Sequence, residues 1–135
     1  MTRYLLDTNI VSYYLRRSSP HLEAKLSIAL RGGDCAISAI TRAELRYSQD
    51  TMTQEDKRRS LIDSFLLRQP NLAWTSGAAD HFGTLKAQLK RQGRPIGELD
   101  TQIAAHALSE DLILVTHNTR HFDRIAGLKL EDWMA

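Results

Sequence analysis

Short apolar segments alternate with longer segments of helical spacing along the whole chain, and this alternation constrains the fold more than any other feature. The apolar segments are residues 3–6, 35–40, 71–74 and 112–115. In the segments between them, apolar residues recur at helical spacing, as Ile10, Val11 and Tyr14 do. Strands that alternate with helices form a parallel sheet with helices on both faces. The sequence therefore predicts an α/β fold.

The same pattern predicts where helices begin and end. Pro20 suits the first turn of a helix that stops at Gly32, and residues 41–44 have the form of a capping box that opens the next helix. Further helices are expected over residues 9–17, from Thr53 up to Pro70, from Ser76 to Gln92 and from Leu99 to Leu108, with a short helix and a strand within residues 120–130. No repeat or linker interrupts the alternation, so one domain over residues 1–135 is expected.

Composition and cysteine content exclude several classes of protein. Hydrophobic residues make up 42% of the chain and charged residues 25%, which is typical of a folded domain. Cys35 is the only cysteine, so neither a disulfide framework nor a cysteine zinc site is expected. The first residues do not have the pattern of an export signal, and no apolar run reaches about eighteen residues. We therefore expect a cytoplasmic protein that does not enter membranes.

Four polar residues follow predicted strands or begin helices beside them. Asp7 comes directly after the first strand, and Glu44 lies in the first turn of the helix after the second. Asp100 lies at the start of the helix after a proline-glycine loop, and Asn118 follows the strand at residues 112–115. Ligands of open parallel sheets bind beyond the carboxyl ends of the strands. These four residues are therefore the candidate catalytic residues.

Three of them are carboxylates, and carboxylates that meet at one edge need a cation or a bound proton. Two carboxylates about 4 Å apart repel by roughly 4 kcal/mol at an intermediate dielectric. Oxygen donors without paired cysteine or histidine suit Mg²⁺, with Mn²⁺ as its substitute. Such an ion activates water and neutralises charge on a phosphate. Asp7, Glu44 and Asp100 therefore predict a metal-dependent phosphodiester hydrolase.

Each acid also has a purely structural interpretation. Asp7 suits the N-cap of the following helix, and Glu44 is the natural last residue of a capping box. Asp100 places a favourable charge at a helix N-terminus, and Glu98 is the alternative ligand beside it.

The histidines and aromatic residues give weaker signals. His117 and His121 are four residues apart, but a transition-metal site between them is not favoured. His106 is expected to be a packed or hydrogen-bonded helix residue and not a ligand, and the aromatic residues Trp74, Phe65 and Tyr47 are assigned to the core.

Taken together, these residues resemble the PIN-domain family, in particular the VapC toxins of bacterial toxin-antitoxin pairs. The resemblance covers nearly the whole chain and depends on an ordered set of segments, namely residues 6–9, 37–45, 91–107, 115–122 and 127–133. It implies a Rossmann-like parallel sheet, a magnesium site and endonucleolytic cleavage of RNA by metal-activated water.

The resemblance also implies roles for individual residues. Asp7, Glu44 and Asp100 match the acidic positions of the family and are the expected metal ligands. A fourth acid is replaced, because Asn118 stands at the corresponding strand end and His121 stands where an acid often precedes an aromatic residue. Asn118 is expected to help position water or phosphate.

Substrate and partners follow from the same resemblance. Residues 91–97 and the ending at Trp133 are most similar to the VapC branch that cleaves initiator tRNA in its anticodon stem-loop, so tRNA(fMet) is the leading substrate. Arg91, Arg94 and Arg120 are expected to bind the RNA backbone, although basic clusters are also found on solvated helix faces. A VapB-type antitoxin and a homodimer are implied as well.

Two other interpretations remain open at this point. A phosphoacceptor domain of the response-regulator kind also carries acids at strand ends, but Asn9 and Trp74 stand where it needs acids. A catalytically weakened RNA- or antitoxin-binding module is favoured by the missing fourth acid.

Overall fold

The computed structural model describes residues 1–135 and contains one five-stranded sheet whose paired strands all run parallel. The strands are β1 (Tyr4–Leu6), β2 (Cys35–Ser38), β3 (Asn71–Leu72), β4 (Ile113–Val115) and β5 (Leu130–Glu131). Their order is β3-β2-β1-β4-β5, so the chain builds outward from β1 first to one side and then to the other. The predicted parallel α/β fold is confirmed.

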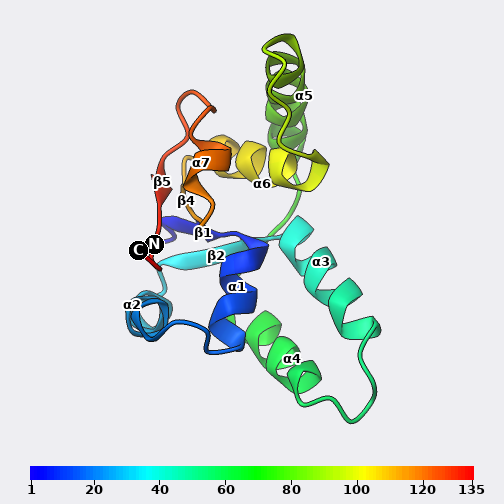
Figure 1. Ribbon diagram of the computed structural model, residues 1–135, viewed down its shortest axis with the longest axis vertical. Coiled ribbons are helices and arrows are strands. Elements are labelled where there is room, and N and C mark those ends of the chain that lie inside the picture. Colours follow the sequence, from blue (N-terminus) through cyan, green and yellow to red (C-terminus); the bar gives the residue numbers. More distant parts are fainter.

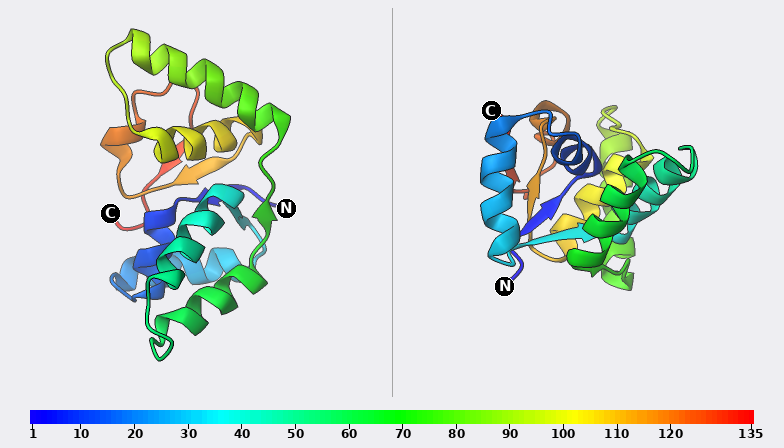
Figure 2. Two further views of the ribbon diagram at one scale, coloured as in Figure 1. Left: turned by 90° about the vertical axis from the view of Figure 1, so that its right-hand side faces the viewer. Right: turned by 90° about the horizontal axis from the view of Figure 1, so that it is seen from below.

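Seven helices surround the sheet (Figure 1). They are α1 (Thr8–Leu15), α2 (Pro20–Arg31), α3 (Ala39–Asp50), α4 (Arg58–Arg68), α5 (Ser76–Arg91), α6 (Glu98–Ser109) and α7 (Thr119–Phe122). Helices α5 and α6 lie on one side of the strands and α1 to α4 lie on the other, as Figure 2 shows in its left view. The helices therefore leave the strand ends as the open edge of the sheet.

Alternate residues of each strand enter two separate cores. Leu6 of β1 and Val115 of β4 pack with α1, α2 and α4, whereas Leu5 and Leu114 pack with α5 and α6. All four side chains are fully buried. A strand buried on both faces has no polar side to expose, which explains why the strands are continuous apolar runs.

Two predicted helix starts and one core assignment are wrong. Helix α3 begins at Ala39 because Ser38, not Thr41, accepts the backbone N–H of Ile40 (3.0 Å). Helix α4 begins only at Arg58, since no apolar residue between Thr53 and Lys57 provides a face to pack. Helix α5 begins at Ser76 as predicted, and its cap is the Thr75 side chain, which accepts the backbone N–H of Ala78.

The core assignment of Tyr47 is also wrong, because this residue is 75% exposed on α3. Phe65 is buried and Trp74 is partly buried, as expected. None of the helices combines the length and the apolar character needed to cross a membrane.

Candidate functional site

The candidate site lies where the central strands β1 and β4 end. The backbone N–H of Asp7, just after β1, donates to the carbonyl of Val115 at the end of β4 (3.1 Å). The two chain segments therefore leave the sheet side by side, at the point where the strand order reverses direction. A pocket of about 230 Å³ opens there, lined by Asp7, Asn9, Tyr13, His117 and Asn118. Such a switch point is the usual ligand crevice of an open parallel sheet.

Asp7 is the buried acid of this pocket, with 6% of its surface exposed. It caps α1 as predicted, because its Oδ1 accepts the backbone N–H of Ile10 (2.8 Å). Burial raises the pKa of Asp7 to about 6; the Thr116 side chain and the Ile10 N–H oppose this rise, and the negative charges of Asp100 and Glu44 add to it. Capping alone does not explain such a residue, since a cap on the surface would avoid the cost of burying a charge.

Glu44 is held by the first residue of α1. The Thr8 hydroxyl donates to Glu44 Oε1 at 2.6 Å and lies 3.1 Å from the Oγ1 of buried Thr41. Because α3 starts at Ala39, Glu44 lies beyond its first turn and has no capping role. The structure therefore removes the capping-box interpretation and leaves a carboxylate oriented toward α1.

Asp100 lies in the first turn of α6 and is joined to α7 by His121. His121 Nε2 is 3.0 Å from Asp100 Oδ2 and 2.6 Å from the carbonyl oxygen of Ile96. Both neighbours accept hydrogen bonds, so Nε2 carries the proton. Burial raises the pKa of Asp100, and the His121 side chain opposes the rise. His121 thus fixes the orientation of the Asp100 carboxylate.

The three acids are electrostatically coupled but stand apart. Both Asp100 and Glu44 raise the pKa of Asp7, yet no group of three or more His, Cys, Asp or Glu side chains is close enough to hold a metal ion. The donors are all oxygen atoms, and buried Asp7 has no cationic partner among the ion pairs. This chemistry fits a hard divalent cation.

The remaining predicted residues lie around this centre. Asn118 lines the pocket with Asp7, and its side chain makes no capping bond to α7. Glu98, the alternative ligand, instead pairs with Lys86 of α5 (2.9 Å). The side chains of Arg91, Arg94 and Arg120 are exposed. The segments around Arg94 and Arg120 are joined by the contact between Ile96 and His121.

Sequence reasoning missed a second carboxylate and histidine pair in the pocket. His117 Nδ1 lies 3.1 Å from each carboxylate oxygen of Asp132, which is fifteen residues away. His117 and His121 thus contact different acids and form no pair of their own. The ending at Asp132 and Trp133 was visible in the sequence, but its link to His117 depends on the pairing of β4 with β5.

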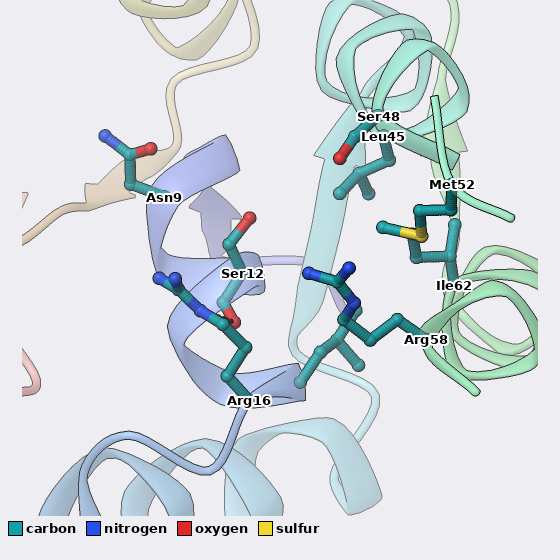
Figure 3. A pocket seen from close by; sticks show the side chains of 9 residues that line it. Asn9, Ser12, Arg16, Leu45, Ser48, Met52, Arg58 and Ile62 are labelled. Carbon is teal, nitrogen blue, oxygen red and sulfur yellow. Dashed lines mark hydrogen bonds between the residues drawn. The ribbon is translucent and has the colours of Figure 1, made fainter. Parts of the chain in front are cut away.

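A larger hollow of about 300 Å³ adjoins the acid pocket between α1, α3 and α4. Asn9 lines both cavities. In the larger one Arg58 reaches across from α4 toward α1, and Ser12 on α1 and Arg16 just after it lie opposite (Figure 3). The apolar lining consists of Leu15, Leu45, Met52 and Ile62. The hollow therefore combines four apolar side chains with polar and basic ones.

Comparison with known proteins agrees with this geometry. Residues 4–128 match the PIN domain model. The chain is 42% identical to ribonuclease VapC2 of Haemophilus influenzae, over 99% of this chain and 100% of that protein. It is 38% identical to the tRNA(fMet)-specific endonuclease VapC of Shigella flexneri, over 98% of this chain and 99% of that protein.

Solved structures give the same assignment. The DNA-bound VapBC structure from Salmonella typhimurium matches with a TM-score of 0.90 and 33% identity, over 98% of this chain and 99% of that one. VapBC2 of Rickettsia felis, bound to a DNA fragment from its promoter, matches with a TM-score of 0.88 and 32% identity, over 98% and 99% of the two chains. This chain belongs to the PIN-domain family and, within it, to the VapC ribonucleases.

Proposed function

We propose that this chain is the toxin of a toxin-antitoxin pair, a metal-dependent endoribonuclease that hydrolyses a phosphodiester bond in tRNA. The observation that carries the proposal is the buried Asp7, whose pKa is raised to about 6 at the crevice and to which Glu44 and Asp100 are coupled. Sequence identity of 38% to 42% with VapC ribonucleases, over nearly the whole chain, supports RNA as the substrate class.

The position of each acid suggests its role in the proposed reaction. Asp7 and Asp100 would hold Mg²⁺, or Mn²⁺ in its place, and Glu44 would complete the site or orient a water. A bound ion of this kind lowers the pKa of a water molecule and neutralises charge on the phosphate. Asn118, whose amide lines the pocket beside Asp7, would position that water or the phosphate. Thr8 and His121 keep Glu44 and Asp100 oriented.

Initiator tRNA is the favoured substrate. The Shigella flexneri and Salmonella typhimurium relatives are named as tRNA(fMet)-specific endonucleases, and the sequence ending and residues 91–97 pointed to the same branch. Arg91, Arg94 and Arg120 are exposed and would bind the RNA backbone.

The test is cleavage of purified initiator tRNA and an elongator tRNA, with Mg²⁺ or with EDTA, followed by mapping of the new ends. We expect cuts in the anticodon stem-loop of the initiator tRNA that need the metal and are at least about 100-fold slower with Asp7→Asn. Equal cleavage in EDTA, or by Asp7→Asn, would contradict the proposal. Cleavage of both tRNAs at equal rates would contradict the substrate assignment alone.

A weakened PIN module that binds RNA or an antitoxin without cutting is the second candidate, favoured by Asn118 at the position of an acid. Calorimetric titration with Mg²⁺ and Mn²⁺ separates the two. An active site binds at least one of the ions, and a relic site binds neither. The PIN assignment replaces the phosphoacceptor interpretation.

The proposed partner is a VapB-type antitoxin, since the similar solved structures are VapBC complexes. An extended or helical antitoxin segment would press against the crevice, with apolar side chains in the hollow of Figure 3 and a basic side chain near Asp7. A structure of the complex that leaves the crevice empty would contradict this. We also propose that the free chain is a homodimer, which light scattering of the purified protein tests.

A further inference from the structure

The side chains of His117 and Asp132 are hydrogen-bonded to each other at the rim of the pocket that contains Asp7. They follow β4 and β5, which pair in parallel with Val115 beside Glu131, so the two strand ends carry them together. Both carboxylate oxygens of Asp132 lie 3.1 Å from His117 Nδ1. Oδ1 of Asp132 also accepts the backbone N–H of Met134 (2.9 Å). The ring of Tyr13 meets the imidazole edge-on, with 6.3 Å between centroids.

The segment that carries Asp132 is anchored firmly. Trp133 is 2% exposed, packs edge-on against Tyr4 at 4.9 Å and donates its indole N–H to Glu131 Oε1 (2.8 Å). These contacts hold residues 131–133 against the core, so Asp132 has little freedom to leave His117. Residues 131–133 therefore stabilise the core and also position His117, which lines the pocket.

This arrangement fixes which nitrogen of His117 meets a ligand. A carboxylate only accepts hydrogen bonds, so Nδ1 of His117 carries the proton that it shares with Asp132. In the neutral imidazole the other nitrogen, Nε2, is then a hydrogen-bond acceptor. His117 lines the same pocket as Asp7 and Asn118. A residue that lines the pocket of the proposed metal-binding acid thus carries a preset acceptor nitrogen.

An acceptor selects a donor on the substrate. Phosphate and ring oxygens of a nucleic-acid backbone are acceptors, and the ribose 2′-hydroxyl is the one backbone group that can donate. Resting on the proposed ribonuclease function, we propose that His117 Nε2 accepts a hydrogen bond from the 2′-hydroxyl beside the scissile phosphate, with Asp132 as its positioning residue. This contact makes the site select RNA over DNA.

The experiment pairs enzyme variants with one-atom changes of the substrate. A short RNA spanning the mapped cut is compared with the same oligonucleotide carrying a single 2′-deoxy nucleotide on the 5′ side of the cut. Cleavage with Mg²⁺ and binding in EDTA, read by fluorescence anisotropy, are measured in the same mildly alkaline buffer. The proteins are wild type, His117→Phe, Asp132→Ala and, as matched control, His21→Phe, which changes an exposed histidine on α2.

Wild type and His21→Phe are expected to lose about fivefold in cleavage and binding with the 2′-deoxy substrate, the worth of one neutral hydrogen bond. His117→Phe is expected to lose a similar factor with all-RNA and nothing more with the 2′-deoxy substrate. Asp132→Ala keeps the imidazole, but it should also reduce the loss in cleavage and binding that the 2′-deoxy substitution causes. A role of Asp132 in stability alone would leave that effect unchanged.

Two results would overturn the proposal. If the 2′-deoxy penalty is the same in wild type and His117→Phe, His117 does not contact this hydroxyl, while RNA cleavage by wild type leaves the proposed function standing. If wild type cuts no RNA in Mg²⁺, the proposed function and this inference fail together.

Discussion

At the scale of single residues, the buried carboxylate of Asp7 lowers the free energy of unfolding of the chain. Its pKa rises from 3.8 to about 6, and burial is the largest cause. A rise of this size means that the charged form destabilises the folded chain by about 3 kcal/mol. The folded state binds a proton more tightly than the unfolded state between these two pKa values. Stability from this group therefore increases as the pH falls through about 6.

Replacing Asp7 by Asn should stabilise the chain while it removes activity. Asn caps helices about as well as Asp and carries no charge, so Asp7→Asn should unfold at higher urea concentration than wild type at about pH 8 in EDTA, by up to about 3 kcal/mol. The difference should vanish at about pH 4, where Asp7 is protonated in wild type. Urea unfolding followed by circular dichroism measures both. A variant less stable than wild type at both pH values would contradict the burial argument.

Thr8 tests whether the orientation of Glu44 matters. Thr8→Val keeps the shape of the side chain and removes the hydroxyl that donates to Glu44 Oε1. The cleavage rate should fall by about tenfold, typical for the loss of a group that orients a ligand. Thr84→Val, on an exposed face of α5, is the matched control and should leave the rate unchanged. An unchanged rate in Thr8→Val, with its fold intact, would show that Glu44 needs no support from α1.

At the scale of elements, His106 of α6 joins three parts of the fold. Its side chain is fully buried, with Nδ1 2.7 Å from the Ser38 hydroxyl at the end of β2. Its ring also packs edge-on against Trp74, which precedes α5 (5.5 Å). Nε2 has no hydrogen-bond partner. Burial lowers the pKa of His106, and the charge of Glu110 and the backbone of Ala73 oppose that shift.

This histidine should make the chain sensitive to acid. A lowered pKa means that the unfolded state takes up the proton first, so stability is present above 6.5 and is lost as the pH falls below it. Asp7 acts in the opposite direction, so the effect is best measured in the Asp7→Asn background. There, the free energy of unfolding should fall between about pH 7 and 5, and the added change His106→Asn should flatten this slope. An equal slope in both proteins would assign the acid sensitivity to another group.

Local signals predicted the elements better than the junctions between them. Apolar runs and helical spacing identified the strands and long helices, because burial on a sheet face imposes those patterns directly. Ser38 and Thr41 both suit a helix cap, and the choice between them depends on where β2 stops, which its neighbours decide. The positions of Asp7 and Asn118 followed from strand order, but the contacts of His121 with Asp100 and of His117 with Asp132 link segments that meet only in the folded chain.

At the scale of the whole molecule, the net charge of +2 hides an uneven distribution. Asp7 lies in the crevice and is coupled electrostatically to Asp100 and Glu44. Arg91, Arg94 and Arg120 lie exposed on α5, on the loop after it and on α7. The Arg94 loop and α7 are held together through Ile96 and His121 (2.6 Å). Positive charge at these exposed positions would attract a polyanion over long range and steer its backbone toward the chain.

This distribution predicts how RNA binding responds to salt. Binding of the substrate RNA in EDTA should weaken linearly on a log-log plot against salt, because each neutralised phosphate releases counterions. Changing Arg91, Arg94 or Arg120 to Ala should reduce the slope by about 0.7 each for single-stranded RNA and weaken binding most at low salt. Arg31→Ala, at the end of α2, is the control and should leave the slope unchanged. Equal slopes for all four variants would mean that the RNA approaches the crevice over a different surface.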